Sequence, residues 1–292
     1  MQKETSTIRA ISAKDFPRRL SEIPDPPERL YLRGSLPPED HRWLCVVGSR
    51  RYSQYGKEVC EKLITGLEGY PVVVVSGLAL GIDAIAHRAT LQAKLPCVAV
   101  PGSGLDPRVL YPSANRRLAE EIVSSGGALV SEFEPNFRAT AWSFPQRNRI
   151  MAGLSDAVLV IEAEQKSGTL ITSRLATEYN RDVFTVPGSI FSSSSAGPHM
   201  LIRLGATPIT SETELREALG FDQTSEHKNL QTKNYTDCSP DELKIVELLK
   251  EPRAREDLIE QLGVPVSRGN AILSMMEIKG LIKESLGEIH LA

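Results

Sequence analysis

Glycine-rich turns beside predicted strands and helices are the residues of this sequence best suited to chemistry. Gly48-Ser49-Arg50 follows an apolar run, and Lys166-Ser167-Gly168-Thr169 precedes a helical stretch. Backbone N–H groups at such turns and helix starts bind anions, and an arginine adds a planar fork of donors for phosphate. The two segments therefore predict a phosphate-binding site. The alternative for the first is that Gly48 only permits a tight strand-to-helix turn.

Motifs for nucleotide cofactors and metals are missing from the sequence. No Gly-x-Gly-x-x-Gly fingerprint is present, and no acidic residue follows the second predicted strand to bind a ribose hydroxyl, so nicotinamide cofactors are not expected. The Lys166 segment also lacks the spacing of an ATP-binding P-loop. The four cysteines form no Cys-x-x-Cys pair. We therefore expect reduced cysteines, no metal site and no cofactor.

A long loop, residues 132–146, is rich in aromatic side chains and leads directly into two arginines. The residues concerned are Phe133, Phe137, Trp142, Phe144, Arg147, Asn148 and Arg149. Long loops inside a compact domain are usually functional. Aromatic faces stack on the bases of single-stranded nucleic acid, and arginines bind its phosphates. The equally good alternative is a hydrophobic cluster that holds a lid, with Arg147 paired to Glu132 or Glu134.

Residues 76–83, Ser-Gly-Leu-Ala-Leu-Gly-Ile-Asp, end the second predicted strand and precede His87. Asp83 is suited to cap the next helix, and His87 lies one turn further along the same side. Catalysis by an Asp–His pair is the alternative, but the sequence places no nucleophile beside it. We expect a structural cap and a buried, hydrogen-bonded imidazole.

Short apolar runs alternate with helical stretches between Trp43 and Leu219. This alternation is typical of the α/β class and predicts a Rossmann-like parallel sheet with helices on both faces. The expected strands are 44–47, 72–76, 97–100, 128–131, 157–161, 182–186 and 207–209. The expected helices are 56–67, 84–92, 116–124, 150–154, 170–180 and 213–219. Ligands bind outside the carboxyl ends of such strands, where the glycine-rich turns would meet.

Three further segments flank this core, which we place at residues 41–220. Residues 1–40 contain six prolines, so we expect an extended lead-in without regular structure. Residues 221–238 are polar and almost without aliphatic side chains, which indicates a linker. Residues 239–292 predict three helices at 241–250, 256–262 and 267–279 and a hairpin at 281–291. This order is typical of a small winged-helix-like domain.

Composition and charge narrow the class of protein and the kind of site. Hydrophobic residues make up 41% and charged residues 24%, as in ordinary globular proteins. The net charge of -3 means that any anion site must be local. The longest aliphatic run, residues 72–75, is far shorter than the ~20 residues of a membrane helix. Because the first residues also lack a signal peptide, we expect a cytoplasmic protein that does not contact membranes.

Six motifs occur in order along the core. They are GSR at 48–50, SGLALGIDAIAH at 76–87, GSGLDPRVLYPSAN at 102–115, FPQRNRIMAGLSD at 144–156, EAEQKSGTLITSRLATE at 162–178 and VPGSI at 186–190. Together they closely resemble the DprA/Smf family of DNA-processing proteins, over about residues 24–219. The resemblance implies a core that binds single-stranded DNA, protects incoming strands in natural transformation and helps to load RecA recombinase. It also implies a homodimer and no catalytic turnover.

The same resemblance assigns the DNA site. Arg50 matches a main phosphate contact, and Phe144 would meet a base. The other residues that would line the pocket are Gly48, Ser49, Arg147, Asn148, Arg149, Lys166, Ser167 and Gly168. This sequence has Leu80 where a basic residue is common in the family, so one positive charge is missing at the edge of the pocket.

The C-terminal domain is a poor candidate for binding duplex DNA. From residue 239 to 292 it carries 7 basic and 10 acidic residues, and its third helix has only Arg268 and Lys279 against Glu277. We therefore expect weak duplex binding, and a protein-contact role is equally consistent with the sequence.

A second class of function is suggested by the same fold. The core also looks related to phosphoribohydrolases, enzymes that cleave nucleoside monophosphates. Their Pro-Gly-Gly-x-Gly-Thr-x-x-Glu motif is not matched, because Leu105-Asp106 follows Gly104, and Ile171-Thr172 stand where the acid should be. We therefore expect a binding protein rather than an enzyme.

Overall fold

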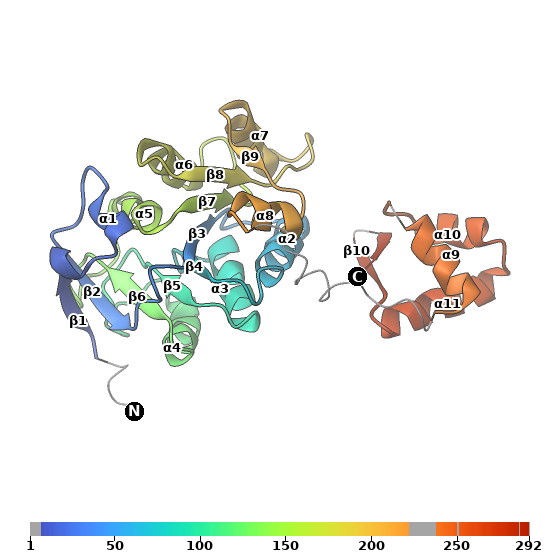
Figure 1. The fold of residues 1–292 in the computed structure, drawn as a ribbon, viewed down its shortest axis with the longest axis horizontal. Helices are drawn as coiled ribbons and strands as arrows, with labels where there is room; N and C mark the ends of the chain where they lie inside the picture. The colour runs from blue at the N-terminus through green and yellow to red at the C-terminus, as the bar shows by residue number, and fades with distance from the viewer. Residues whose placement is uncertain (1–6, 222–237, 250, 286, 292) are drawn as a thin grey trace. The chain divides into compact units, whose positions relative to one another are not determined.

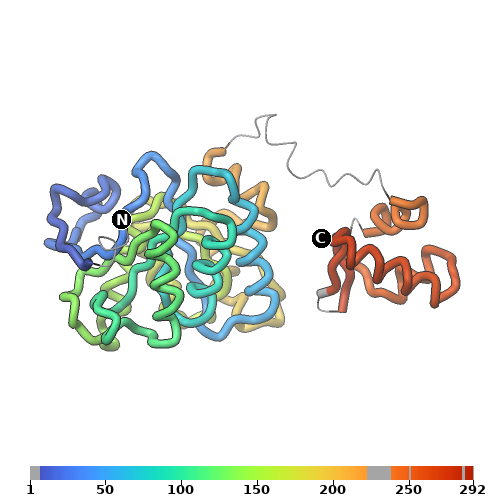
Figure 2. The backbone as a smooth tube through the Cα atoms, turned by 90° about the horizontal axis from the view of Figure 1, so that it is seen from below, coloured from blue at the N-terminus to red at the C-terminus, as the bar shows by residue number. Residues whose placement is uncertain are grey.

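The computed structural model describes residues 7–221, 238–249, 251–285 and 287–291. The chain forms two compact units, Met1–Asp222 and Gln223–Ala292 (Figures 1 and 2). Each unit has its own hydrophobic core, so each is described by itself.

A nine-stranded sheet forms the centre of the described part of the first unit (Figure 1). Its strands are β1 (Arg9–Ser12), β2 (Arg29–Gly34), β3 (Arg42–Val47), β4 (Val72–Ser76), β5 (Cys97–Ala99), β6 (Ala128–Ser131), β7 (Ala157–Val160), β8 (Asp182–Thr185) and β9 (Thr207–Pro208). Their order is β1-β2-β6-β5-β4-β3-β7-β8-β9. All neighbours from β6 to β9 are parallel, whereas β1 and β2 are antiparallel additions. The predicted parallel sheet is therefore confirmed.

Helices cover both faces of this sheet. The α-helices of the first unit are α1 (Arg18–Ser21), α2 (Gln54–Thr65), α3 (Ile82–Gln92), α4 (Arg116–Ser124), α5 (Ser143–Leu154), α6 (Thr169–Glu178), α7 (Ala196–Arg203) and α8 (Glu212–Ala218). Apolar residues of α1, α5, α6 and α7 pack on one face, and those of α2, α3, α4 and α8 on the other. Strand β3 contributes apolar side chains to both faces of the sheet. Trp43 and Cys45 pack on the face covered by α1, α5, α6 and α7, and Leu44 packs on the opposite face. A strand buried on both faces needs an unbroken apolar run.

The prediction of an extended, irregular lead-in at residues 1–40 is wrong for the described part of that segment. It contains β1, a 3-10 helix (Ala13–Asp15), α1 and β2, and β2 pairs with β6 of the main sheet. Leu20 and Leu30 are fully buried in the core. The prolines lie outside the strands and α1, and each element is too short to show a sequence period.

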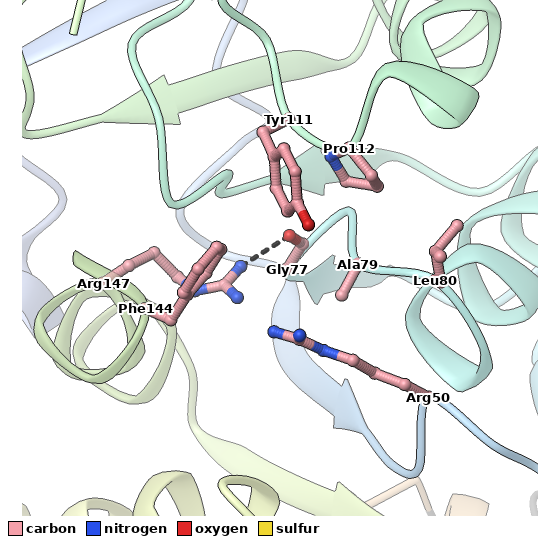
Figure 3. Close-up of a pocket in the computed structure, with 8 residues that line it drawn as sticks. All are labelled: Arg50, Gly77, Ala79, Leu80, Tyr111, Pro112, Phe144 and Arg147. Atoms are coloured by element: carbon pink, nitrogen blue, oxygen red, sulfur yellow. Dashed lines mark hydrogen bonds between the residues drawn. The ribbon is translucent and has the colours of Figure 1, made fainter. Parts of the chain in front are cut away.

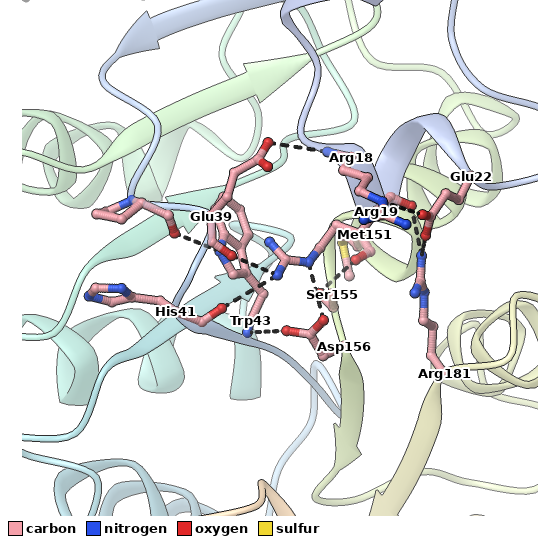
Figure 4. Close-up of polar contacts among 11 residues, drawn as sticks. Arg18, Arg19, Glu22, Glu39, His41, Trp43, Met151, Ser155, Asp156 and Arg181 are labelled. Atoms are coloured by element: carbon pink, nitrogen blue, oxygen red, sulfur yellow. Dashed lines mark hydrogen bonds and ion pairs between the residues drawn. The ribbon is translucent and has the colours of Figure 1, made fainter.

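Arg19 joins this N-terminal segment to the central strands (Figure 4). Its Nε lies 3.2 Å from Oδ1 of Asp156, and the other oxygen of Asp156 accepts a 2.8 Å hydrogen bond from the backbone N–H of Trp43. The Arg19 guanidinium lies 5.3 Å from the centre of the Trp43 ring. Arg181 donates to the carbonyl of Arg19 at 2.7 Å. The segment is therefore part of the core unit rather than an appendage.

Two helices differ substantially from the prediction. Helix α5 begins at Ser143 rather than at residue 150, and α7 lies between residues 180 and 213, where no helix was expected. Each has a proline, Pro145 or Pro198, in its first turn, where the N–H has no partner within the helix. A proline in the first turn is therefore compatible with both helix starts.

The second unit confirms the predicted three helices and hairpin. They are α9 (Pro240–Leu248), α10 (Arg255–Leu262), α11 (Val266–Ile278), β10 (Ile282–Ser285) and β11 (Glu288–Leu291). Ser239 and Glu242 form a capping box at the start of α9. Ile245, Leu258 and Leu273 share one core with both strands. The expected linker at 221–238 lies outside the described residues, except for its two ends.

The sequence predicts reduced cysteines and no membrane-spanning helix. Cys45, Cys60 and Cys97 are buried as free thiols, and burial raises the pKa of each. Within the described ranges, every helix is too short or too polar to span a bilayer.

Candidate nucleic-acid interface

The strand order creates a crevice between the carboxyl ends of β3 and β7. The chain runs from β3 outwards through β4 and β5 to β6, then crosses to β7 on the other side of β3. Ligands of open parallel sheets bind where the strand order reverses in this way. The Gly48-Ser49-Arg50 turn follows β3, and the Lys166–Thr169 segment follows β7. The topology thus brings together two segments that the sequence predicted to bind phosphate.

A cavity of about 350 Å³, here called the central cleft, opens at this point. Eight of the ten residues predicted for the DNA site line it: Gly48, Ser49, Arg50, Phe144, Arg147, Asn148, Ser167 and Gly168. A smaller cavity continues it, sharing Arg50, Ala79, Phe144 and Arg147 and adding Gly77, Leu80, Tyr111 and Pro112 (Figure 3).

Arg50 is the positive charge of the central cleft that lies beside aromatic rings; Arg51 also lines the cleft. The Arg50 guanidinium lies 5.1 Å from the centre of the Phe144 ring, a cation–π contact. It forms no ion pair with any described residue. The Phe144 ring in turn lies 5.7 Å from the Tyr111 ring. A cation without a carboxylate partner beside two aromatic rings can bind a phosphate and a base together.

Close backbone packing holds the Arg50 turn in place. Gly81 has a φ of +85°, and a Cβ there would collide with the backbone of Ser49 and Arg50. The N–H of Ile82 donates to the carbonyl of Ser49 at 3.2 Å. A Cβ on Gly48 would lie 2.7 Å from the Ile82 side chain. A glycine is therefore needed at position 48 because α3 approaches so closely. This packing constraint is a second reason for Gly48, in addition to the tight turn considered from the sequence.

Arg147 has a structural position that the sequence did not reveal. It is only 5% exposed, and its Nη1 donates to the carbonyls of Gly77, at 2.6 Å, and Val100. It thereby bridges the loops that leave β4 and β5; Figure 3 shows the bond to Gly77. Burial lowers the pKa of Arg147, and the nearby Asp83 carboxylate opposes that shift. Arg147 therefore stabilises the wall of the cleft, and its buried charge is less accessible to a ligand than that of Arg50.

Asp83 does not cap α3 as predicted. Gly81 occupies the N-cap, and the Asp83 carboxylate accepts hydrogen bonds from the N–H groups of Gly77 and Ala79 at 3.1 and 3.4 Å. Burial raises the pKa of Asp83, and the Arg147 charge partly offsets this. The carboxylate therefore fixes the backbone of the loop after β4 by binding two of its N–H groups.

Asn115 supports the same loop from the other side. Its Nδ2 donates to the carbonyls of Leu78 and Ala79 at 2.8 and 3.0 Å. Leu78 is buried with a φ of +56°, a conformation that costs a non-glycine residue energy and that its surroundings must enforce. This role of Asn115 was missed because no local pattern links residues so far apart in sequence.

His87 is the buried, hydrogen-bonded imidazole that the sequence predicted. Its Nδ1 lies 3.0 Å from the Cys97 sulfur. Burial, with a smaller contribution from Arg147, lowers the pKa of His87 to about 3, so the ring is neutral at physiological pH. It lies outside the lining of both cavities.

Arg149 and Lys166 do not line the central cleft, contrary to expectation. Arg149 follows Arg147 by two helical residues, about 200° around the axis, and so lies on another face of α5. It pairs with Glu132 and lies 3.6 Å from the Asp25 carboxylate. The alternative given for the aromatic loop paired Arg147 with Glu132 or Glu134. This pairing is wrong, because Glu132 pairs with Arg149. Lys166 is exposed beside the cleft.

The start of α6 forms the opposite wall of the cleft. The Ser167 hydroxyl accepts a hydrogen bond from the N–H of Thr169 at 3.2 Å, and the Thr169 hydroxyl donates to the carbonyl of Gly48 at 3.2 Å. Asn148 donates to the carbonyl of Gly168 at 3.4 Å. These bonds tie the Gly48 turn, α5 and α6 together around a helix N-terminus, which favours an anion. Glu164 also lines the cleft, so the cleft carries charges of both signs.

The predicted aromatic loop divides into two parts. Phe133 and Phe137 stack on each other with centroids 4.6 Å apart, and Phe133 is only 7% exposed, so they form the hydrophobic cluster given as the alternative. Phe144 lies in the central cleft, on the first turn of α5. Trp142 is 55% exposed. The loop itself is shorter than predicted, because α5 begins at Ser143.

Comparison with known proteins identifies the family. Residues 7–220 match the model of the family described as DNA recombination-mediator protein A. The chain belongs to this family. Residues 232–287 match the DprA winged helix domain, which agrees with the fold of the second unit. The resemblance to DprA/Smf proteins drawn from the six motifs is thereby confirmed.

Relatives and solved structures give the extent of the similarity. DNA processing protein DprA of Streptococcus pneumoniae is 44% identical over 223 residues, 76% of this chain and 78% of that protein. Protein Smf of Escherichia coli is 43% identical over 210 residues, 70% of this chain but only 54% of that protein. The chain thus spans about half the length of the E. coli relative.

Two solved structures share the fold of the core. The X-ray structure of DprA from S. pneumoniae has a TM-score of 0.66 and 41% identity, covering 74% of this chain and 76% of that chain. A structure of DNA processing protein A from Helicobacter pylori has a TM-score of 0.65 and 29% identity, covering 73% and 96%. The H. pylori structure is described as giving insight into the single-stranded DNA binding mode of that protein.

Proposed function

We propose that this protein binds single-stranded DNA in the central cleft and acts in DNA processing. The observation that carries the proposal is Arg50, a guanidinium without an ion-pair partner among the described residues, held over Phe144 at the mouth of the cleft. The H. pylori relative, whose structure is described in terms of single-stranded DNA binding, supports the choice of ligand.

In this proposal the cleft binds the sugar-phosphate backbone. Arg50 and the N–H groups at the start of α6 contact phosphates, and Phe144 with Tyr111 meets one base. Contacts of this kind carry no base-edge hydrogen bonds, so binding is tolerant of sequence. A duplex keeps its bases stacked inside, so its bases cannot reach Phe144, and single strands are preferred.

The biological role we propose is protection of incoming strands and help in loading RecA recombinase during transformation, in the cytoplasm. The family's description as a recombination mediator supports this role. Formation of RecA filaments on oligonucleotides, measured with and without the protein, tests it.

We also propose that the protein is a homodimer. Ile190 and Phe191 are 80% and 94% exposed, and adjacent apolar side chains this exposed are typical of a contact surface. Sedimentation velocity of the full chain gives the oligomeric state.

We propose that the protein has no catalytic turnover. Ile171 and Thr172 line the cleft at the position where phosphoribohydrolases carry an acid. Without that acid the cleft lacks the group which such enzymes use. Release of free base from nucleoside monophosphates by the purified protein would support the enzyme alternative instead.

Variants of Arg50 test the proposed DNA site. Arg50→Ala removes charge-assisted hydrogen bonds worth about 1.5–3 kcal/mol each, so affinity for oligothymidylate should fall about 10- to 150-fold. Arg50→Lys should weaken binding less, because a point charge replaces a fork of donors. The melting temperature should stay nearly unchanged, since Arg50 forms no ion pair with a described residue and its contact with the Phe144 ring lies at the cleft surface.

Arg88→Ala is the matched control for these variants. Arg88 is exposed on α3 and carries the same charge, but it lines neither cavity. It should bind oligothymidylate like the wild type. If Arg50→Ala binds normally, or unfolds, the site assignment is wrong.

A further inference from the structure

Trp142 stands out among the aromatic side chains because it is exposed and lies two residues before Phe144, which lines the central cleft. The chain has two tryptophans: Trp43 is fully buried, whereas Trp142 is 55% exposed. An indole is a large apolar surface, and its exposure costs free energy unless a ligand covers it.

The backbone around Trp142 is fixed relative to the cleft. The buried hydroxyl of Ser143 donates to the carbonyl of Gly102 at 2.6 Å, and the N–H of Gly104 donates to the carbonyl of Phe137 at 2.9 Å. Two residues after Trp142, the Phe144 ring packs so closely on Gly102 that a Cβ there would lie 2.6 Å from it. Trp142 and Phe144 are thus held on one anchored turn, with their Cα atoms at most about 7 Å apart, and their side chains leave that turn in different directions.

The indole is supported without being covered. It meets Phe133 at 5.7 Å and an angle of 78°, and Phe137 at 5.5 Å and 62°, so neither ring lies parallel to it. Phe133 and Phe137 stack on each other instead. A tryptophan braced in this way loses little side-chain entropy when a flat ligand binds.

A positive charge accompanies the indole in the same loop. Arg138 is exposed and forms no ion pair within the described chain. An exposed aromatic ring near an unpaired arginine is the combination that binds single-stranded nucleic acid, because the ring stacks on a base and the cation attracts the backbone.

We propose that Trp142 stacks on a nucleobase of the strand held in the central cleft, next to the base that meets Phe144. The ligand is a single-stranded polynucleotide of any sequence, because every base presents a flat face. This inference rests on the proposed function and adds a second base position outside the cleft.

Tryptophan fluorescence of the full chain tests the proposal directly. Oligothymidylate with an end label is titrated while label anisotropy and tryptophan emission are recorded in the same samples. We expect emission to be quenched along the same binding curve as the anisotropy. Trp142→Phe retains only the buried Trp43, so its emission should not change on binding.

An abasic deoxyribose-phosphate oligomer separates stacking from phosphate contacts. It should still bind through Arg50 but should leave the tryptophan emission unchanged. Trp142→Ala should reduce affinity for oligothymidylate about 5- to 150-fold, the range expected for one stacked base, and should not alter affinity for the abasic oligomer. Ile278→Ala, which removes an exposed apolar side chain of the second unit, is the control and should bind normally.

The possible outcomes distinguish this inference from the proposed function. If anisotropy rises while emission stays constant, or the abasic oligomer quenches equally, Trp142 does not stack on a base, although the cleft still binds DNA. If anisotropy does not rise at all, the proposed function itself fails.

Discussion

Replacing Arg147 with alanine should destabilise the first unit much more than replacing Arg50. The change removes the donor shared by the Gly77 and Val100 carbonyls and takes away the larger of the two arginine charges, Arg147 and Arg50, that act on the buried Asp83 carboxylate. Removing one partner of a buried charge pair costs about 3–5 kcal/mol, and an unsatisfied buried carbonyl about 1–3 kcal/mol. Since part of this cost is recovered by relaxation and water, we expect a loss of about 4 kcal/mol.

Thermal unfolding followed by circular dichroism measures this loss. For a unit of this size, about 2–4 °C per kcal/mol gives a melting temperature lowered by roughly 8–16 °C. Arg50→Ala should change the stability by less than about 0.5 kcal/mol, because the change breaks no ion pair among the described residues and only a cation–π contact with Phe144 at the cleft surface. The two variants thus separate the residue that builds the cleft from the one that binds.

The loss in Arg147→Ala should depend on pH. Burial raises the pKa of Asp83 above its unfolded value, so the folded state binds more protons and stability falls as pH rises through the folded pKa. Without Arg147 the pKa of Asp83 rises further. The stability difference between variant and wild type should therefore be largest near neutral pH and shrink as pH falls towards about 4. A melting temperature within about 2 °C of the wild type at pH 7 would refute this reasoning.

The placement of the charges leads to two further predictions. Arg149→Ala should lower the free energy of unfolding by about 2–4 kcal/mol, because it leaves the partly buried Glu132 without its ion-pair partner. The same change should alter the affinity for oligothymidylate less than twofold. A large loss of affinity would show that Arg149 does contact the DNA. Residues 1–222 alone should retain single-strand binding. Residues 239–292 should not bind DNA measurably in about 0.15 M salt, because Arg268 of α11 and Lys279, which follows it, pair with Asp241 and Glu242. Micromolar duplex binding by the second fragment would contradict this.

The parallel sheet was predictable because burial on both faces imposes an unbroken apolar run, as in the four valines of β4. The N-terminal strands were not, because strands of four and six residues separated by prolines show no period. Their place in the sheet depends on pairing with β6, about a hundred residues later.

The glycine-rich walls of the site were predictable for a similar reason. The topology of a parallel sheet brings the turns after β3 and β7 to the same crevice. The roles of Arg147 and Arg149 were not predictable once α5 was started seven residues too late. With the correct start at Ser143, helical geometry alone separates the two arginines onto different faces.

The most direct test of the account is a titration of the full chain with oligothymidylate and with a duplex of equal length at several salt concentrations. Arg50 and Arg51 line the cleft and Lys166 precedes its Ser167 in sequence; none of these three cations has an ion-pair partner among the described residues. At about 0.7 per neutralised phosphate, they predict a slope of log K against log salt near -2 for the single strand. We expect this slope, together with much tighter binding of the single strand than of the duplex. Equal affinity for both, or a single-strand affinity that does not depend on salt, would contradict it.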